Sequence, residues 1–392
     1  MIRKQTAIVG IGQTEISKAS GRTEWELALE AIQAALADAG IDASEIDGVV
    51  RYGYDNVTPA MLTRTLPIQD LRWYGEIPFG GTAQCGVVAQ ACAAIVSGIA
   101  TTVLIYRSLN ERSGVRYGRA ERNIAAEGNV VRAAGLKAPA GQFCGPYGLL
   151  VPGQCMAMWA QRYAYEHGID TDQLSLSLGA VAVQQRKYAN RNPLAMMRDR
   201  PLDMDAYLSS RMISSPLRLF DYCLESDGAA AMVITKADRA RALRADPVYV
   251  LSAQQSLYAY SESTMVYTQS LTEMAKPDNI EKLYRDAGVS SSNVSVAQFY
   301  DATSMGPLAA LEEYGFCKKG EAWKYVVDEG FGLDSRLPFN THGGHLSEGY
   351  LHGFNHLTEA VRQLRGTAAN QVRSAEVALI GCNGQSSAIF AR

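Results

Sequence analysis

The sequence of 392 residues has few features that would direct it to nucleic acid or into a membrane. It has 37 lysines and arginines against 40 aspartates and glutamates, which gives a net charge of −3 with no long block of like charge. That balance argues against a nucleic-acid-binding surface. No apolar run reaches roughly 18 residues, and the first residues, MIRKQTAIVGIG, lack an apolar signal core. We therefore expect a cytoplasmic protein that does not insert into membranes.

Cysteine is present, but its spacing is not that of a metal site. The seven cysteines are odd in number and no two of them form a Cys-x-x-Cys pair. This suits reduced thiols better than zinc ligands or a disulfide framework. An HExxH helix is absent as well. We expect the chain itself to bind no metal ion and no cofactor.

Histidine, in contrast, is concentrated in one place. Four of the five histidines lie in segment 339–356, FNTHGGHLSEGYLHGFNH, together with Gly343, Gly344 and Tyr350. Glycine lets backbone approach a ligand closely, and imidazole and phenol groups supply proton donors and acceptors. The segment is therefore a candidate active site, with a polar turn of solvated histidines or a metal site as the alternatives. The interposed glycines favour substrate approach over metal binding. The histidines concerned are His342, His345, His352 and His356.

An internal duplication predicts the fold class. Residues 38–49, DAGIDASEIDGV, return in the second half as residues 286–297, DAGVSSSNVSVA. The first copy follows a predicted helix with a Thr23/Glu26 capping box, and the second follows a predicted helix that Pro277 opens. Both helices are flanked by β-rich runs, so we predict a layered α/β fold that is built twice. The β-rich runs are residues 7–10, 48–50, 248–251 and 294–300.

The same pattern divides the chain into two halves, residues 1–245 and 246–392. The boundary falls in the charged run KADRARALRAD at residues 236–246. Between about residues 106 and 212 the periodicity weakens, which predicts an insertion that covers a site or contacts another subunit. Trp159 and Tyr163 within this insertion favour an ordered, packed region.

Two further motifs are candidates for ligand contact. Gly80 and Gly81 precede an alanine-rich helix in residues 79–98, and the start of a helix suits a negatively charged group. The alternative is tight packing of that helix. Tyr300 and Asp301 follow the predicted strand of the second copy, at the carboxyl end where open α/β sheets hold their sites. The alternative for Tyr300 is a half-buried strand residue.

With these motifs the chain resembles the thiolase superfamily, and within it the lipid-transfer-protein branch. The resemblance covers nearly the whole chain: AIVGIG near the start, the Gly-Gly helix, SDGAAA at residues 226–231, NTHGG, and VRQLRG at residues 361–366. It implies duplicated βαβαβαββ halves in an α/β/α/β/α arrangement. It also implies a homodimer in which the insertion covers the active site.

The departures from the thiolase pattern concern the catalytic groups. Gly81 stands where a thiolase has its nucleophilic cysteine, and Cys85 lies one helical turn further on, where we expect it to face the helix packing. Tyr300-Asp301 replaces the histidine-aspartate pair of sterol-carrier-type thiolases, and Gly349-Tyr350-Leu351 replaces their Gly-His-Pro. Without the thiol, acyl transfer through a covalent intermediate loses its first step.

These substitutions, with NTHGG, VRQLRG and NERSG at residues 110–114, resemble the lipid-transfer-protein aldolases of bacterial steroid side-chain degradation. That resemblance implies retro-aldol cleavage of a β-hydroxyacyl-CoA into a ketosteroid and a short acyl-CoA such as propionyl-CoA. It also implies a small partner with a zinc ribbon and an OB fold, attached to or associated with a hydratase. Zinc would then belong to the partner.

Retro-aldol cleavage needs a base, an acid and donors for the thioester enolate. Tyr300 and Tyr350 are the predicted acid-base pair, and the sequence leaves open which is the base. A basic tyrosinate requires a depressed pKa, which we expect His342, His345 and His352 to provide. Asp301, Gly343 and Gly344 are supporting residues. The predicted enolate donors are backbone groups near Gly80 and Gly81 or in the turn Cys382 to Gly384.

Two other functions stay open at this point. One is an acyltransferase with Cys85 or Cys382 as nucleophile, and the other is a noncatalytic carrier of lipids or acyl-CoA. The sequence does not fix the side-chain length or the ring system of the substrate.

Overall fold

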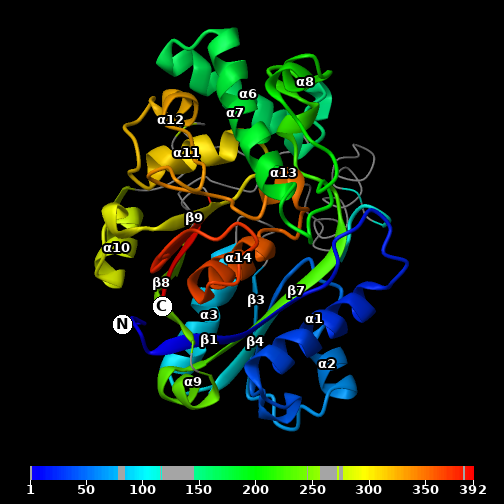
Figure 1. The fold of residues 1–392 in the computed structure, drawn as a ribbon. Helices are drawn as coiled ribbons and strands as arrows, with labels where there is room; N and C mark the ends of the chain where they lie inside the picture. Colours follow the sequence, from blue (N-terminus) through cyan, green and yellow to red (C-terminus); the bar gives the residue numbers. More distant parts are fainter. Residues whose placement is uncertain are drawn as a thin grey trace.

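The computed structural model describes residues 2–77, 84–114, 116, 145–244, 246–256, 272, 277–382 and 385–392. In the described part, nine strands form one mixed sheet in the order β3-β2-β4-β7-β1-β8-β11-β10-β9. Figure 1 shows how the helices are arranged around these strands. The strands are β1 (Thr6–Gln13), β2 (Gly48–Tyr52), β3 (Trp73–Ile77), β4 (Thr102–Asn110), β7 (Asp227–Lys236), β8 (Val248–Gln255), β9 (Val296–Phe299), β10 (Val377–Cys382) and β11 (Ser386–Ala391). A separate hairpin joins β5 (Met212–Ser214) to β6 (Leu217–Arg218).

The order of the strands confirms the predicted duplication. β1 and β8 pair antiparallel at the centre of the sheet. Outward from β1 come β7, antiparallel, then β4, antiparallel, then β2, parallel. Outward from β8 come β11, β10 and β9 with the same three orientations. Each half of the chain thus contributes an equivalent set of four strands, and β3 extends the first half at one edge.

The two predicted helices that begin each repeat are confirmed. Helix α1 (Glu24–Ala39) begins with the Thr23/Glu26 capping box and ends at Gly40, which has a φ of +67°. Helix α10 (Pro277–Ala287) ends before Gly288, with a φ of +66°. Both glycines adopt the left-handed conformation that terminates a helix, which is unfavourable for other residues.

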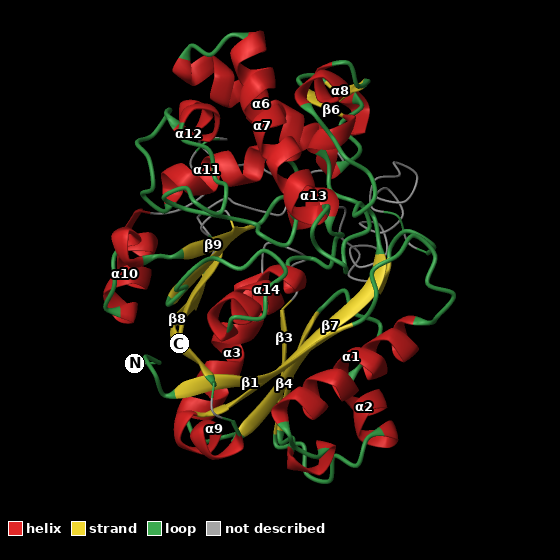
Figure 2. Cartoon of the chain, in the orientation of Figure 1, coloured by secondary structure: helices red, strands yellow, loops and turns green. Residues whose placement is uncertain are grey.

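Two helices lie between the half-sheets and form the central layer (Figure 2). Helices α3 (Gln84–Val96) and α14 (Phe354–Arg365) each contact strands of both halves. Their apolar side chains, such as Val88 and Leu357, are fully buried in the core between the sheets. Helix α1 covers the outer face of the first half, and α10 and α11 (Met305–Glu313) cover that of the second. The expected α/β/α/β/α arrangement is therefore present.

The remaining helices surround this framework. They are α2 (Pro59–Thr65), α6 (Pro152–His167), α7 (Thr171–Ala189), α8 (Met204–Leu208), α9 (Ala237–Leu243), α12 (Ala322–Asp328) and α13 (Gly344–Ser347). Among the residues described, none of the helices is long and apolar enough to span a bilayer.

Within the insertion, the described residues 145–212 form a packed region, as Trp159 and Tyr163 predicted. Both side chains are almost fully buried in one core with residues of α11 and α12. Strand β4 continues to Asn110, so the excursion from the sheet begins a few residues later than expected. Helix α7 packs against α13, the short helix inside the histidine-rich segment. The insertion therefore covers the segment that the sequence singles out.

Close packing of β1 on α1 gives a test of the fold. A Cβ atom on Gly10 would lie 2.0 Å from the backbone oxygen of Ala35 and 2.8 Å from the Cβ of Ala39. We expect Gly10→Ala to lower the free energy of unfolding by about 1–3 kcal/mol, because one element has to move. Urea unfolding would measure this. Gly332→Ala is the control, since no atom lies within 4 Å of its Cβ position, and equal midpoints for both variants would contradict the packing.

Candidate active site

The two tyrosines that the sequence singles out lie side by side. Tyr300 directly follows β9, and Tyr350 lies between α13 and α14. Their hydroxyl oxygens are 2.6 Å apart, in a hydrogen bond that either group can donate. The rings meet edge to face with centroids 6.3 Å apart, and the residues are 6% and 8% exposed. Two positions 50 residues apart in the chain therefore form one buried pair of phenols.

The pKa values of both phenols shift in the direction opposite to our expectation. Burial raises the pKa of Tyr300 well above its usual value, and the neighbouring thiol of Cys382 adds to the effect. Burial raises the pKa of Tyr350 in the same way, and Tyr300 adds to the effect. The expectation of a tyrosinate at neutral pH is therefore wrong. Each phenol holds its proton in the resting protein.

The histidines expected to ionise a tyrosine serve other purposes. The ring of His345 meets both phenol rings edge to face, with centroids 5.0 Å from Tyr300 and 4.8 Å from Tyr350. The ring of His352 is 4.8 Å from Tyr350 in the same geometry. In the described part of the chain, no histidine forms a hydrogen bond to either phenol oxygen. The imidazoles pack beside the tyrosine pair, and because all four are buried, the alternative of solvated histidines is wrong.

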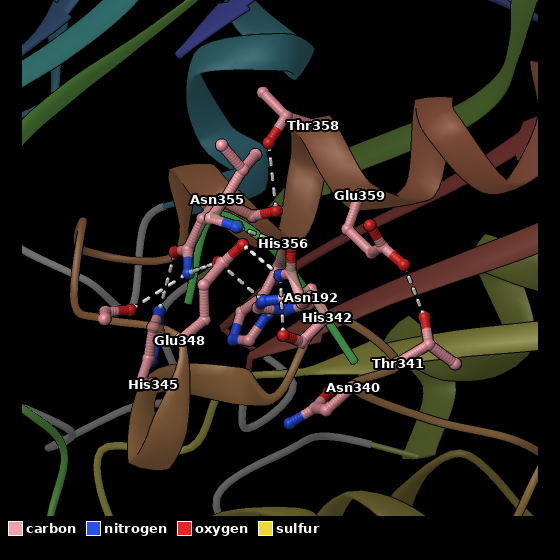
Figure 3. A network of polar contacts seen from close by, with 12 residues as sticks. Asn192, Asn340, Thr341, His342, His345, Glu348, Asn355, His356, Thr358 and Glu359 are labelled. Carbon is pink, nitrogen blue, oxygen red and sulfur yellow. Dashed lines mark hydrogen bonds and ion pairs between the residues drawn. The ribbon is translucent and has the colours of Figure 1, made fainter. Parts of the chain in front are cut away.

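Four buried ionisable side chains form a chain of hydrogen bonds, of which Figure 3 shows Glu348, His342 and His356. Oε2 of Glu348 is 2.7 Å from Nδ1 of His342, and Nε2 of His342 is 2.8 Å from Nδ1 of His356. Nε2 of His356 is 3.0 Å from Oδ1 of Asp301. All four side chains are essentially inaccessible to solvent.

The number of hydrogen bonds fixes the number of protons in this chain. Each of its three contacts needs one proton, and an ionised carboxylate has none to give. With both carboxylates ionised, the four ring nitrogens must hold all three protons, so one imidazole is charged. These four hydrogen-bonded side chains thus include one imidazolium between two carboxylates.

The pKa shifts assign that charge to His342. Burial alone would lower the pKa of His342, but the adjacent Glu348 outweighs it and raises the pKa. Burial opposes ionisation of Glu348, but the charge of His342 and its hydrogen bond lower that pKa to about 2. Burial, followed by the charge of His345, lowers the pKa of His356 to about 3. His342 therefore donates from Nδ1 to Glu348 and from Nε2 to His356, and His356 donates from Nε2 to Asp301.

Asp301 links this chain to the tyrosine pair. The backbone N–H of His345 donates to both carboxylate oxygens of Asp301 at 3.0 Å. Burial opposes ionisation of Asp301, but the contacts with His345 and His356 lower its pKa. A Cβ atom on Gly344, whose φ is +61°, would lie 2.2 Å from Oδ2 of Asp301. Gly344 therefore lets the backbone approach the carboxylate of Asp301. We had expected it to let the backbone approach a ligand.

The neighbouring Gly343 is equally constrained by protein groups. Its φ is +110°, and a Cβ atom there would lie 2.8 Å from the Cβ of Ala189 at the end of α7. Asn192, just beyond α7, donates to Oε1 of Glu348 at 3.0 Å, and Asn355 donates to Oε2 at 2.7 Å. The insertion thus contacts the histidine-rich segment through backbone packing and through the carboxylate of Glu348.

The two cysteines considered as nucleophiles differ in position. Cys85 is fully buried in α3, with its Sγ 3.6 Å from the backbone oxygen of Ile380, and burial raises its pKa well above the usual value. The prediction that it faces the helix packing is confirmed. Cys382 packs directly against Tyr300 and Tyr350, and burial also raises its pKa. Gly80, Gly81 and Gly384 lie outside the described residues.

One group of side chains has the composition of a metal site. Asp301, His345 and His356 each offer one ligand atom, and these atoms lie within 4.8 Å of one another. Nε2 of His356 and Nδ1 of His345 lie 3.0 and 3.1 Å from Oδ1 of Asp301. Nε2 of His356 is hydrogen-bonded to Asp301, whereas Nδ1 of His345 has no hydrogen-bond partner among the described residues.

Several residues of the site were not predicted from the sequence. Glu348 completes the buried chain with His356, which was among the candidate histidines, Asn355 and Asn192 orient it, and Cys223 packs beside the tyrosine pair. Glu348 and His356 lie inside the histidine-rich segment, which was the available signal. Their partners depend on how that segment folds back on itself.

Comparison with known proteins assigns the family. Residues 258–389 match the "Thiolase C-terminal domain-like" family. A steroid side-chain-cleaving aldolase of Thermomonospora curvata is 40% identical over 93% of this chain and 91% of its own length. A 17-hydroxy-3-oxo-4-pregnene-20-carboxyl-CoA lyase of Mycobacterium tuberculosis is 39% identical over 97% and 96%. The chain belongs to the lipid-transfer-protein aldolases of the thiolase superfamily. It is therefore a carbon-carbon lyase that acts on acyl-CoA.

Solved structures agree with this membership. The "Ltp2-ChsH2(DUF35) aldolase" is 38% identical, covers 100% of this aldolase and 98% of its own chain, and has a TM-score of 0.89. Human mitochondrial 3-ketoacyl-CoA thiolase, at 14% identity and a TM-score of 0.68, shows the shared fold alone.

The charged His342 gives the aldolase a pH-dependent stability. Its pKa is raised above the ordinary value of 6.5, so this contribution is fully present below pH 6.5 and is lost as pH rises through the folded value. We expect the melting temperature of the native protein, relative to that of His342→Gln, to fall between about pH 6.5 and 9. Thermal melts across this range would measure the difference. A difference that stays constant with pH would contradict the assignment of the charge.

Proposed function

We propose that this aldolase cleaves a steroid β-hydroxyacyl-CoA by a retro-aldol reaction, releasing a ketosteroid and a short acyl-CoA such as propionyl-CoA. The relatives named above, at 39–40% identity over more than nine-tenths of the chain, support the substrate class. The observation that carries the mechanism is the 2.6 Å hydrogen bond between Tyr300 and Tyr350. The resemblance to sterol-carrier-type thiolases, in which Tyr300 and Tyr350 replace two histidines, supports a reaction without covalent acyl transfer.

In the proposed reaction the two phenols pass one proton along their hydrogen bond. The β-hydroxyl gives its proton to one phenol oxygen while that phenol gives its own to the other. As it receives this proton, the second phenol gives its own proton to Cα, which takes the electron pair of the breaking Cα–Cβ bond, and Cβ becomes the carbonyl carbon of the ketone. One proton leaves oxygen and one reaches carbon, so both phenols end as they began.

The geometry of the pair suits this transfer. The hydroxyl oxygen and Cα are both bonded to Cβ, so their separation is comparable to that of two hydrogen-bonded oxygens. A relay between neutral phenols also avoids a resting tyrosinate, which burial makes unfavourable here. Each unit by which a pKa lies above the pH adds about 1.4 kcal/mol to the free energy of ionisation. Concerted transfer within the pair removes that cost.

The supporting residues have separate roles in this proposal. Asp301 and the chain behind it hold the backbone at His345, whose ring contacts both phenols. Backbone donors at Gly80, Gly81 and the turn from Cys382 to Gly384 remain our prediction for the enolate oxygen. The raised pKa values of Cys85 and Cys382 argue against a thiolate, so we propose that no acyl-enzyme forms. That the chain binds no cofactor stays our prediction.

We also propose that the aldolase works in the cytoplasm as a homodimer with a small zinc-ribbon and OB-fold partner attached to a hydratase. The name of the similar structure, Ltp2-ChsH2(DUF35) aldolase, supports a second component. Strand β3 lies at an edge of the sheet and exposes 68% of Tyr74, which supports pairing with a second copy. Any zinc would belong to the partner.

The tyrosine pair gives the main test of this function. We expect Tyr300→Phe and Tyr350→Phe each to reduce kcat for cleavage of a steroid β-hydroxyacyl-CoA by about 10²–10⁴-fold, because either change breaks the relay. Ketosteroid release would be measured with the OB-fold partner present. Cys85→Ala is the control and should keep its activity. Full activity in either phenylalanine variant would exclude that tyrosine from the mechanism.

The absence of a covalent step is tested separately. We expect mass spectrometry of the protein, quenched during turnover, to show no acyl adduct on Cys85 or Cys382, because neither thiol is ionised at neutral pH. A trapped acyl-enzyme would favour the acyltransferase alternative. Tight binding of the substrate with no turnover, even with the partner present, would favour the carrier.

A further inference from the structure

A short segment that follows the insertion passes beside both tyrosines. Residues 221–226, DYCLES, lead from the β5–β6 hairpin to β7, and we call them the DYCLES segment. The side chain of Cys223 packs against the tyrosine pair. The segment belongs to the first half of the chain, whereas both tyrosines belong to the second. It therefore joins the two halves at the site.

The turn after Tyr300 pairs with the beginning of the DYCLES segment. The backbone N–H of Ser304 donates to the backbone oxygen of Asp221 at 2.9 Å, and the hydroxyl of Ser304 donates to Oδ1 of Asp221 at 2.8 Å. The backbone N–H of Cys223 donates to the backbone oxygen of Ala302 at 3.0 Å. An antiparallel bridge lies between these contacts. The path of the chain directly after Tyr300 is thus held by backbone contacts and by one carboxylate.

The last residue of the same segment holds Tyr350. The backbone N–H of Tyr350 donates to Oγ of Ser226 at 3.0 Å, and the hydroxyl of Ser226 donates to the backbone oxygen of Leu224 at 2.7 Å. The backbone N–H of Leu224 donates in turn to the backbone oxygen of His345 at 3.0 Å. Because Ser226 is fully buried, bulk solvent does not compete for these hydrogen bonds.

The carboxylate of Asp221 has donors on three sides. Besides Ser304, the hydroxyl of Tyr207 in α8 lies 2.8 Å from each carboxylate oxygen, and the backbone N–H of Arg218 donates to Oδ2 at 2.6 Å. Burial raises the pKa of Asp221 to about 6, and these donors with the charge of Arg218 limit the rise. The carboxylate is therefore ionised at neutral pH, and ionised acceptors form the stronger hydrogen bonds. It connects the insertion to the turn that follows Tyr300.

We propose that Asp221 and Ser226 are positioning residues that set the separation of the two phenols. The proposal rests on the proposed retro-aldol function. Asp221 acts on Tyr300 through the turn that ends at Ser304. Ser226 acts on Tyr350 through its backbone N–H. Because both residues belong to one short segment, a displacement at either end changes the distance between the phenol oxygens.

The proton relay depends on this distance more than substrate binding does. Proton transfer requires the two oxygens to lie within hydrogen-bond distance, and the interaction weakens steeply when the geometry departs from it. A misplacement of about 1 Å can lower a rate about 100-fold. The groups that bind the substrate stay in place when only the phenols move apart. We therefore expect a positioning error to lower kcat and to leave KM nearly unchanged.

Two serine variants each remove one contact and leave the buried carboxylate in place. Ser304→Ala removes the hydroxyl donor to Asp221, and Ser226→Ala removes the acceptor for Tyr350. With the OB-fold partner present, we expect each to lower kcat for a steroid β-hydroxyacyl-CoA about tenfold or more, with KM changed by less than about twofold. Ser177→Ala is the control and should keep the native kcat. Ser177 is also fully buried, but its hydroxyl donates to a backbone oxygen of its own helix, α7.

The hydrogen bond between the phenols gives a readout that needs no turnover. Proton NMR of the native protein without substrate would record the resonance of the hydroxyl proton shared by Tyr300 and Tyr350, assigned by its loss in Tyr300→Phe. We expect this resonance to move upfield in Ser304→Ala and in Ser226→Ala, because the distance between the oxygens increases. It should keep its position in Ser177→Ala. A general loss of stability would lower the melting temperature of a variant without moving the resonance.

The two measurements separate this proposal from the proposed function. If the native enzyme shows no cleavage, the proposed function fails, and the resonance alone decides on the positioning. A resonance that stays at its native position in Ser304→Ala or in Ser226→Ala would overturn the role of Asp221 or of Ser226, respectively. In an active enzyme, an unchanged kcat would do the same, whether or not KM rises, because the relay would then not depend on the DYCLES segment.

Discussion

The hydrogen bond between the hydroxyls of Tyr300 and Tyr350 is the interaction on which the rest of the site depends. It joins the end of β9 to the segment between α13 and α14, so the separation of the phenols depends on how these two elements are held. Asp301, the next residue after Tyr300, binds the backbone of His345 in α13. The same carboxylate thus fixes both sides of the tyrosine pair. The surrounding imidazoles and carboxylates place the phenols and leave them neutral.

Buried charge here serves to order the structure. Charges in a protein interior are costly unless opposite charges and hydrogen bonds offset them. Glu348, His342, His356 and Asp301 meet that condition as one chain with a single imidazolium, and Asn192 and Asn355 supply further donors. Each member has its protons fixed by its neighbours, so a change at one end alters the hydrogen bonds at the other. This explains the density of histidines in one short segment without assigning any of them to proton transfer with the substrate.

The sequence was sufficient to predict the duplicated fold, because the signals for it are local. A capping box, a proline at a helix start and glycines at helix ends act within a few residues, and the same pattern occurs twice. The tyrosine pair was also predicted, from two motifs that the superfamily resemblance placed at one site. The charge state of the phenols was predicted wrongly, because burial, which raises their pKa, depends on neighbours far apart in the chain. The same is true of the contact between Ser226 and Tyr350, 124 residues apart, and of the atoms that Gly344 approaches.

The central claim is that both phenols are neutral before the reaction starts. The most direct measurement is NMR of the protein labelled with ¹³C at Cζ of tyrosine, recorded in the absence of substrate from pH 6 to 9, with Tyr300→Phe and Tyr350→Phe used for assignment. Our account predicts the chemical shift of an un-ionised phenol for both residues throughout this range, since burial raises both pKa values. A tyrosinate signal near neutral pH that disappears in either variant would contradict it.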